Sequence, residues 1–411
     1  PLTLTNRFYT YATATNSYIN TGLSASSTFI PGKGFAVRAP NTFPTVPQTW
    51  EGVFTGIPNN GNIPFTLETS GTGYNLVGNP YPSPIDAASF ISGNPNISGS
   101  LYFYAHTLTM GTNGLFPAGT NYAVWNASGS TAATSGTSGV PSFLPNGTIK
   151  VGQGFIVKAT SSGTVNFNNG MRINNTQNQF FRNATPLERH RLWLNLSNTS
   201  GIDYNQIMVG YIEGATMGFD TNFDALAFGN SGSALASKID GLDYTIQGRA
   251  LAFSNNDNVL LGFKAEIAGN YTITLTDKDG LFLESQAVYI LDTTTNSTHE
   301  IKTAPYTFYS EAGTFDNRFQ LVYSIALGTP ISEFNSNSVK AYKKEEIYTV
   351  SSREIPIKEV LAYDTLGRLI FKQSNINAQS VELTGLTSTK QIVFLKVISQ
   401  ENSSVSIKIN N

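Results

Sequence analysis

The sequence predicts an almost entirely β protein, built from tandem β-sandwich domains of the immunoglobulin-like or jelly-roll-like kind. Charged residues make up only 13% of the 411 residues, and 37 glycines together with many Asn, Ser and Thr suit tight turns. Hydrophobic residues reach 40% and aromatic residues 12%, which is enough for substantial cores. Short apolar runs recur at a spacing near ten residues, which is typical of strands joined by turns.

Composition also excludes several function classes. The net charge of −2 gives no electrostatic reason to bind nucleic acid or an anionic membrane. Cysteine is absent, which excludes disulfides and thiolate chemistry. No apolar run is long enough to predict a transmembrane helix. The chain begins at Pro1 without a basic leader, so we expect any signal peptide to have been removed or to lie upstream.

The first part of the chain contains an internal repeat. The stretch Thr28–Ala39 recurs as Thr148–Ala159, and each copy carries Gly-x-Gly-Phe at the start of a strand. Neither motif continues to a Gly-x-x-Gly spacing or a helix, so we interpret both as tight turns and not as phosphate cradles. The second copy opens with Tyr74–Pro84, for which the first copy has no counterpart. We therefore expect the chain to be the C-terminal part of a longer polypeptide that begins within the first copy.

Two further features of the repeats concern possible ligands. Pro80, Pro82 and Pro84 each fix φ, so Gly-Asn-Pro-Tyr-Pro predicts a stiff corner that is architectural and not catalytic. The stretch Leu115–Ser142 is rich in Gly, Ser, Thr and Ala and predicts a long surface loop. Trp125 within this loop either stacks on a sugar or another protein, or folds back on a sandwich edge, and we favour the second interpretation.

A third region begins at Arg189 and contains alternating runs up to Tyr323, which predict another sandwich or jelly roll. Ser324–Asn337 contains Gly, Pro, Ser and Asn and predicts a linker. The predicted organisation is a partial β repeat over 1–70, a second β repeat over 71–184, a β-sandwich over 185–325, a linker over 326–337 and a terminal domain over 338–411.

The terminal region predicts a small two-sheet sandwich of six or seven short strands. Val405, Ile407 and Ile409 alternate with polar residues, which is the period of a half-buried strand. The stretch Asp364–Arg368 separates two strand-like runs, and Gly367 can adopt the positive φ that a hairpin loop needs.

This terminal region resembles the C-terminal sorting domains of Bacteroidetes proteins that are exported by the type IX secretion system. The resemblance lies in Val360–Leu369, which contains a Tyr-Asp-x-x-Gly-Arg hairpin, and in Lys390–Val397 and Ser406–Ile409. The opening Asn-Pro and the Gly-x-Tyr of the commonest subtype are absent, so the match is closer to the variant called type C. The Gly-Asn-Pro-Tyr-Pro corner and the runs Tyr289–Asp292 and Gly313–Phe319 also resemble modules that precede such domains.

The resemblance implies the C-terminal part of a secreted or cell-surface protein, with the terminal sandwich as its export signal across the outer membrane. It implies two partners, namely the outer-membrane barrel translocon and an outer-membrane barrel protein that captures sorting domains. A strand pair ending near the terminus also suits addition to a partner's sheet edge. The residues that we expect at this sorting or partner-binding site are Tyr363, Asp364, Gly367, Arg368, Lys396, Val405, Ile407, Lys408 and Ile409.

We expect no enzymatic activity, no cofactor and no metal site in this chain. His106, His190 and His299 are dispersed, and none has the i, i+4 partner of a zinc-binding helix. No Gly-x-Ser-x-Gly or phosphate-binding loop occurs. The run Asp220–Asp224 begins like a Ca²⁺ loop but lacks its glycine and its final glutamate, so a hydrated acidic turn is the favoured interpretation.

Several alternatives stay open at this stage. The first alternative is that the terminal domain is an ordinary immunoglobulin-like module without a transport role. Many aromatics, few charges and repeated sandwiches also fit a carbohydrate-binding or adhesive module that recognises surface glycans. A third alternative is the accessory region of an enzyme whose catalytic domain lies upstream. Asp292-Thr293-Thr294 and Asp364-Thr365-Leu366 resemble the Asp-Thr-x acceptor of Bacteroidetes O-glycosylation, although a hairpin turn alone explains Asp364.

Overall fold

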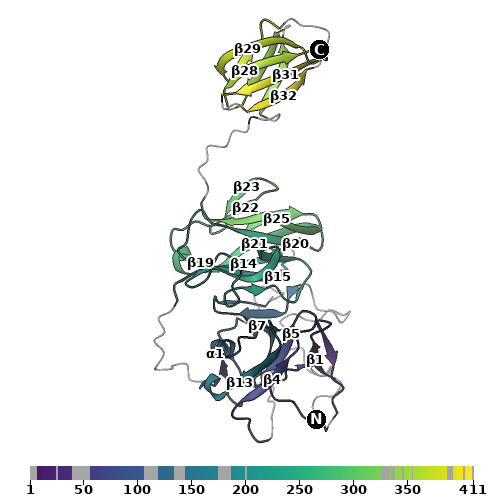
Figure 1. The fold of residues 1–411 in the computed structure, drawn as a ribbon, viewed down its shortest axis with the longest axis vertical. Helices are drawn as coiled ribbons and strands as arrows, with labels where there is room; N and C mark the ends of the chain where they lie inside the picture. Colours follow the sequence, from purple (N-terminus) through teal and green to yellow (C-terminus); the bar gives the residue numbers. More distant parts are fainter. Residues whose placement is uncertain are drawn as a thin grey trace. The chain divides into compact units, whose positions relative to one another are not determined.

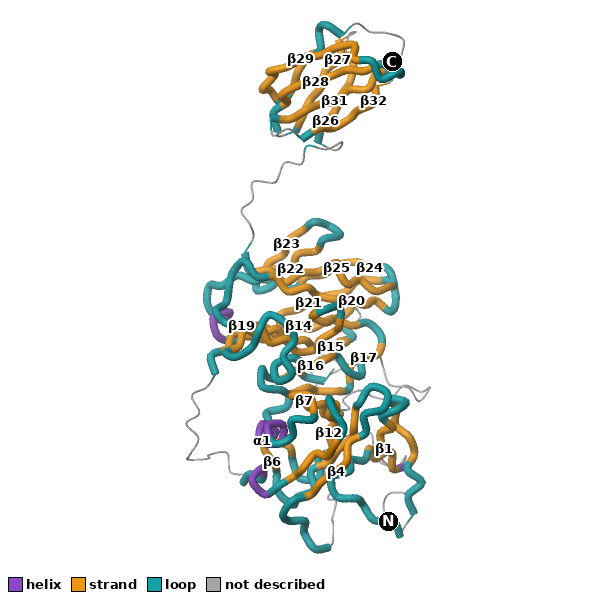
Figure 2. Tube along the Cα trace, viewed as in Figure 1, coloured by secondary structure: helices purple, strands orange, loops and turns teal. Residues whose placement is uncertain are grey.

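The computed structural model is an almost entirely β protein, which confirms the predicted fold class (Figures 1 and 2). The helices of the described residues are α1 (Ala87–Ser92) and short 3₁₀ turns, and none is long and apolar enough to span a membrane. The structure describes residues 7–24, 26–38, 56–105, 119–133, 144–174, 187–199, 201–324, 334, 338–344, 347–353, 355–386, 392–400 and 403–409.

The chain forms two compact units, Pro1–Ile325 and Ala326–Asn411. The division coincides with the predicted end of the third region at residue 325. Most of the predicted linker over 326–337 lies outside the described residues. Phe334 within that stretch is buried and packs in the hydrophobic core of the second unit, so this core begins before the predicted start of the terminal domain.

The repeat region of the first unit consists of small antiparallel sheets. Its strands are β1 (Phe8–Ala12), β2 (Ser17–Asn20), β3 (Ala36–Val37), β4 (Ile63–Leu67), β5 (Tyr74–Gly78), β6 (Ile85–Asp86), β7 (Ile97–Tyr104), β8 (Gly119–Thr120), β9 (Tyr122–Trp125), β10 (Ser130–Thr131), β11 (Thr148–Ile149), β12 (Gly154–Ala159) and β13 (Gly163–Phe167). They form a three-stranded sheet β2-β1-β3, a five-stranded sheet β10-β9-β7-β12-β5, and the pairs β11-β6 and β13-β4. The pair β13-β4 joins strands from both predicted repeats, so the two repeats share structure across residue 70.

Both copies of the Gly-x-Gly-Phe motif pack against β5. One edge of β5 pairs with β12 of the second copy. At its other edge the backbone N–H of Gly34 donates to the Leu76 carbonyl oxygen at 3.1 Å. A Cβ at Gly34 would lie 2.6 Å from the Val77 carbonyl oxygen, so this close approach requires glycine. The first glycine of each motif, Gly32 and Gly152, has a φ of 81° and 66°, which confirms the predicted tight turns.

The Gly-Asn-Pro-Tyr-Pro corner is held by hydrogen bonds and burial. The Asn79 side-chain amide donates to the carbonyl oxygens of Ser83 (2.9 Å) and Lys150 (3.1 Å). The Tyr81 ring is buried, and its hydroxyl donates to the Gly61 carbonyl oxygen. These contacts tie the corner to both sides of the repeat region, as an architectural element would be.

The stretch that we predicted as a long surface loop contains the three strands β8, β9 and β10, so this prediction is wrong for residues 119–133. Strand β9 pairs with β7 and β10, and Trp125 on β9 packs, partly buried, against the repeat core. The favoured interpretation of Trp125 is thereby confirmed. The Gly-, Ser- and Thr-rich composition correctly indicates turns in this stretch. The short apolar run that begins at Tyr122 nevertheless forms a strand between these turns. The rest of the predicted loop lies outside the described residues.

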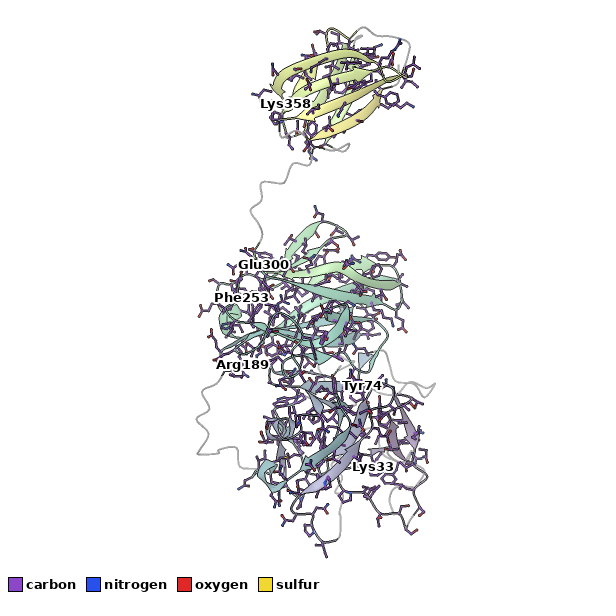
Figure 3. The ribbon with its side chains drawn as sticks, in the orientation of Figure 1. Lys33, Tyr74, Arg189, Phe253, Glu300 and Lys358 are labelled. Atoms are coloured by element: carbon purple, nitrogen blue, oxygen red, sulfur yellow. The ribbon has the colours of Figure 1, made fainter. Side chains whose placement is uncertain are left out.

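The third region folds as one large curled sheet. Its strands are β14 (Arg189–Asn198), β15 (Asp203–Ile212), β16 (Ala225–Leu226), β17 (Asn230–Ser231), β18 (Ala234–Ile239), β19 (Leu242–Ala250), β20 (Asn258–Ala265), β21 (Gly269–Lys278), β22 (Tyr289–Asp292), β23 (Ser297–Glu300), β24 (Tyr306–Ser310) and β25 (Gly313–Val322). The strand order is β23-β22-β25-β20-β18-β19-β15-β14-β21-β24, with β16 paired to β19, while β17 pairs with β8. The pair β15-β19 is parallel. The sheet encloses a large apolar core, and Phe253, labelled in Figure 3, packs against it. The Phe253 ring contacts the rings of Tyr211, Phe282 and Tyr323.

A second aromatic cluster joins the repeat region to the large sheet. Phe228 lies among the rings of Tyr74, Tyr102 and Tyr122, at centroid distances of 4.3, 5.2 and 4.7 Å. Trp193 of β14 packs in the same cluster, and its Nε1 donates to the Ser130 carbonyl oxygen at 2.7 Å. The predicted first three regions therefore pack together in one unit.

The second unit is a two-sheet sandwich of seven strands in its described residues. They are β26 (Val339–Lys344), β27 (Ile347–Ser352), β28 (Ile357–Tyr363), β29 (Leu369–Ala378), β30 (Ser380–Glu382), β31 (Val393–Ser399) and β32 (Ser404–Ile409). One sheet has the order β26-β27-β30 and the other β29-β28-β31-β32 (Figure 1). Val360, Leu395, Val397 and their neighbours fill the core between the sheets. This confirms the predicted small sandwich.

Candidate partner-binding surface

The Asp364–Arg368 hairpin joins β28 to β29 and contains three of the predicted site residues, and a fourth, Tyr363, ends β28 directly before it. The Asp364 Oδ1 atom accepts hydrogen bonds from the backbone N–H groups of Leu366 and Arg368, both at 2.9 Å. Its Oδ2 atom accepts from Arg368 Nε at 2.7 Å. Gly367 has a φ of 75°, so glycine fits this turn without strain. The carboxylate thus organises the whole loop.

The charges of this hairpin differ strongly in exposure. Asp364 is buried, whereas the Arg368 side chain is 74% exposed. Hydrogen bonds from the Arg368 backbone N–H and guanidinium, and from the Leu366 N–H, hold the pKa of the Asp364 carboxyl below its usual value. The carboxylate therefore stays ionised at neutral pH, while the Arg368 side chain is exposed to solvent, as is the Leu366 side chain.

Tyr363, Lys396 and Lys408 are brought to one face by the register of the four-stranded sheet. Side chains two residues apart on a strand share a face, and directly paired residues lie side by side across strands. The pairings place on the solvent side, which we call the outer face, the rows Leu369, Tyr363, Phe394 and Lys408; Lys372, Leu361, Lys396 and Ser406; and Ser374, Glu359, Ile398 and Ser404. The alternate apolar residues of the same strands are buried in the core or, like Phe371 and Ile407, pack against it partly buried.

The three predicted residues Val405, Ile407 and Ile409 are on the opposite side of β32. Val405 and Ile409 are buried in the core, and Ile407 packs against it partly buried. Their side chains hold the last strand in place. β32 ends the strand order of its sheet, so its outer backbone edge has no strand partner among the described residues. This backbone edge, and not the apolar side chains, is what β32 offers to a partner strand.

Sequence reasoning missed Phe394 and Leu369, which are exposed on the outer face by 41% and 52%. The run Ile392–Ile398 is nearly continuous in apolar residues, so its alternation was hidden. The signal that could have revealed it is Lys396, because a charged residue inside such a run marks the solvent-facing positions and places Phe394 and Ile398 beside it.

The two described histidines of the first unit form hydrogen bonds to the backbone. The His190 Nδ1 atom accepts from the Leu281 N–H at 3.2 Å, and His299 Nε2 lies 2.8 Å from the Ala304 carbonyl oxygen. His106 lies outside the described residues. Among the residues that the structure describes, no three His, Cys, Asp or Glu side chains are grouped so that they could hold a metal ion.

The acidic turn at residues 220–224 is fixed by backbone donors. The Asp224 carboxylate accepts from the Gly248 N–H at 2.8 Å and from the Asp220 N–H at 2.6 Å. The Asp220 carboxylate in turn accepts from the Thr216 N–H. Burial raises the pKa of the Asp224 carboxyl to about 7, although these hydrogen bonds partly oppose the shift. Both carboxylates thus accept hydrogen bonds from backbone N–H groups and fix the loop between β15 and β16.

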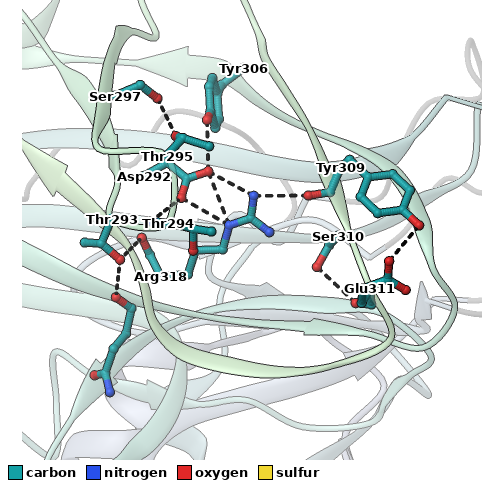
Figure 4. Close-up of polar contacts among 11 residues, drawn as sticks. Asp292, Thr293, Thr294, Thr295, Ser297, Tyr306, Tyr309, Ser310, Glu311 and Arg318 are labelled. Carbon is teal, nitrogen blue, oxygen red and sulfur yellow. Dashed lines mark hydrogen bonds and ion pairs between the residues drawn. The ribbon is translucent and has the colours of Figure 1, made fainter. Parts of the chain in front are cut away.

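The other Asp-Thr-x stretch contains a buried ion pair. Asp292 on β22 is hydrogen bonded to the Arg318 guanidinium of β25, with Nη2 at 2.9 Å from Oδ2 (Figure 4). The Tyr306 hydroxyl donates to the same oxygen at 3.0 Å, and Arg318 Nη2 also donates to the Tyr309 carbonyl oxygen at 3.1 Å. Because Tyr306 and Tyr309 belong to β24, this network links the two ends of the large sheet.

Comparison with known families adds two matches. Residues 1–323 match the family described as Domain of unknown function (DUF8693). The chain belongs to this family. Residues 327–411 match a second family, described as Domain of unknown function (DUF8694), which corresponds closely to the second compact unit. No curated protein matches the sequence.

Proposed function

We propose that this chain is the C-terminal part of a protein that a type IX secretion system exports to the cell surface or the medium. Residues 326–411 are the export signal in this proposal. The outer-membrane translocon barrel and a capturing outer-membrane barrel protein are its partners.

The observation that carries the proposal is the autonomy of the terminal unit. It has its own core, it is a compact unit in the chain, and a separate family model matches it. An export signal that is read as a folded module needs this independence from the cargo. The Tyr-Asp-x-x-Gly-Arg hairpin, which carries the resemblance to sorting domains, is an ordered loop with an exposed arginine. Such a loop suits recognition by a partner.

The hydrogen bonds of the carboxylates in the first unit favour a role as exported cargo over a catalytic role. The described carboxylates at the turn 220–224 and at Asp292 are bound to backbone N–H groups or to Arg318. The glycan-binding alternative has little support from Trp125, because this ring packs against the repeat core and is only partly exposed. We therefore assign the recognition role to the terminal unit.

The direct test is to express the full chain, with a periplasmic leader, in a bacterium that has a type IX system. The full chain should reach the surface or the medium, measured by protease accessibility on intact cells and by immunoblotting of the medium. A chain ending at Ile325 should stay in the periplasm. Its thermal unfolding, followed by tryptophan fluorescence, controls for loss of fold, since all three tryptophans lie before residue 326. Export of the truncated chain at the level of the full chain would contradict the proposal.

A further inference from the structure

The outer face of the β29-β28-β31-β32 sheet combines an apolar centre with uncompensated positive charge. Leu369, Tyr363 and Phe394 form one continuous cross-strand row, and Leu361 follows in the next row. Leu369 and Phe394 are exposed, and Tyr363 and Leu361 are partly exposed. Contiguous apolar and aromatic groups of this kind, bordered by charge, are typical of protein interaction sites.

The basic residues of this face fall into two groups. The Lys372 ammonium lies 2.9 Å from a Glu359 carboxylate oxygen, so its charge is compensated within the sheet. Lys396 and Lys408 have no such partner among the described residues. Because Lys408 is paired with Phe394 and Lys396 with Ser406, the two lysines are diagonal neighbours on adjacent strands. Diagonal positions are about 7–8 Å apart, so the two ammonium groups repel each other without a carboxylate between them.

The charge of the terminal unit agrees with this local pattern. Residues 326–411 contain ten Lys and Arg against eight Asp and Glu, a net charge of +2 (10 − 8), in a chain with a net charge of −2. Residues 1–325 therefore have a net charge of −4 (15 − 19), so the positive excess belongs to the second unit alone. A partner surface with carboxylates would compensate the two lysines and attract the unit during approach.

We propose that the outer face is the docking surface for a protein partner that presents an apolar hollow bordered by Asp and Glu side chains. Phe394 and Tyr363 fill the hollow, and Lys396 and Lys408 pair with the carboxylates at its border. The inference rests on the proposed function in that the partner is a protein of the export machinery, but it assigns the contact to one sheet face. The exposed hairpin at Arg368 then lies at the periphery of the contact.

The test uses the full chain in a type IX host and two matched double variants. Lys396→Glu with Lys408→Glu reverses the two lysines of the outer face. Lys340→Glu with Arg353→Glu makes the same change in net charge on exposed residues of β26 and of the turn after β27, in the other sheet. Surface substitutions of this kind leave folding nearly intact, and the thermal unfolding of both variants checks this. The outer-face variant should deliver about tenfold less protein to the surface, and the control less than about twofold less.

A photo-crosslinker identifies the contact directly. Benzoylphenylalanine replaces Phe394 in one full-length chain and Tyr342 of β26, which is also an exposed aromatic residue, in another. Position 394 should form an adduct with an envelope protein of the host, which the Lys396→Glu, Lys408→Glu change removes and which rising NaCl weakens, because salt screens exposed charge pairs. Position 342 should form no such adduct. Mass spectrometry of the adduct should find the partner's crosslinked segment to contain Asp or Glu.

The outcomes separate this inference from the proposed function. If the outer-face variant is exported normally and the crosslinker at position 394 forms no adduct, the docking surface is overturned and the export proposal stays intact. If the unsubstituted chain is not exported, the export proposal fails and the adduct alone decides the docking surface. The docking surface would also be overturned if position 394 formed an adduct only within the same chain or with a second copy. The same conclusion would follow if no adduct formed and the full chain instead co-floated with phosphatidylglycerol vesicles in a charge-dependent way.

Discussion

The two Asp-Thr-x turns of this protein have the same local chemistry and opposite surroundings. In both, the aspartate accepts a hydrogen bond from the backbone N–H two residues later, which is Thr294 at 3.0 Å in one turn and Leu366 at 2.9 Å in the other. Asp292 pairs with an arginine that is 7% exposed, whereas the arginine partner of Asp364 is 74% exposed. The local motif thus fixes the turn, and only the tertiary contacts decide what its arginine does.

The buried pair is part of a packed network. Arg318 lies 4.7 Å from the Phe308 ring centroid and 4.8 Å from that of Phe319. The ion pair therefore sits within an aromatic core, where removal of one partner leaves an unpaired buried charge. In the pair of Asp364 with Arg368 only the carboxylate is buried, and the arginine side chain is 74% exposed, so the guanidinium is accessible to a partner. The comparison predicts large structural effects in the first unit and small ones at the hairpin.

The largest expected effect comes from breaking the buried pair. Arg318→Leu should lower the free energy of unfolding of the first unit by about 3–5 kcal/mol, since Asp292 remains buried without its partner. Urea denaturation followed by tryptophan fluorescence measures this. The double variant Arg318→Leu, Asp292→Leu should recover much of the loss. Equal destabilisation by the single and double variants would show that the charge is not the cause.

The buried Asp224, which forms no ion pair among the residues that the structure describes, extends the comparison to the pH dependence of stability. Burial raises the pKa of Asp224 to about 7, above its value in the unfolded chain. The folded state therefore binds this proton more tightly, so the free energy of unfolding should fall by at most about 1.4 kcal/mol per pH unit as pH rises from about 4 to about 7. Asp224→Asn should remove this component, and the exposed Asp240→Asn should keep it. An unchanged pH slope in Asp224→Asn would refute the assignment.

Asp292 should show the opposite dependence on pH. Although burial raises the pKa of its carboxyl, hydrogen bonds from Arg318 and Tyr306 outweigh burial and lower it. Stability from this group is present above the unfolded value of about 3.9 and is lost as pH falls below it. Acid unfolding of the first unit should therefore be less steep in the Arg318→Leu, Asp292→Leu variant. A steeper acid transition in that variant would contradict the lowered pKa.

The hairpin should respond mainly through its backbone. Gly367→Ala places a Cβ at a φ of 75°, which costs about 1–2 kcal/mol for a residue with a side chain. Gly367→Asn should cost less, because asparagine tolerates this region better. The melting of the second unit, measured by circular dichroism, tests the order of the two variants. Equal stability of all three proteins would mean that the turn does not keep this conformation.

The smallest expected effect is that of the exposed arginine. Arg368→Gln should leave the melting temperature of the second unit nearly unchanged, because ion pairs of exposed arginines contribute little to stability and the Asp364 carboxylate keeps its two backbone N–H donors. Its effect should appear in export, as a reduction smaller than that of the paired lysine reversal. A large loss of stability in Arg368→Gln would mean that this pair is structural, like the one at Arg318.

Local pattern was sufficient for part of this fold. The alternation at Val405, Ile407 and Ile409 gives the strand and its inward side, and Gly367 gives the hairpin, since both depend on neighbours along the chain. The pattern could not give the pairing of β15 with β19, or the contact of Asp292 with Arg318, because these depend on which distant strands meet. The outer face also required the register, since Lys396 and Lys408 become neighbours only through the pairing of β31 with β32.

The most direct measurement of the central claim is the export of a reporter. Residues 326–411, fused to an inert periplasmic protein, should carry it to the surface of a type IX host, whereas removal of Val405–Asn411 should retain it inside. This deletion removes two buried side chains, each of which contributes roughly 1.5–3 kcal/mol. The Lys396→Glu, Lys408→Glu fusion, which keeps the core, separates lost recognition from unfolding. Surface delivery of the wild-type fusion, with retention of the folded charge-reversed one, is the predicted result. Retention of the wild-type fusion, or delivery of the truncated one at the same level, would contradict the assignment of residues 326–411 as an export signal.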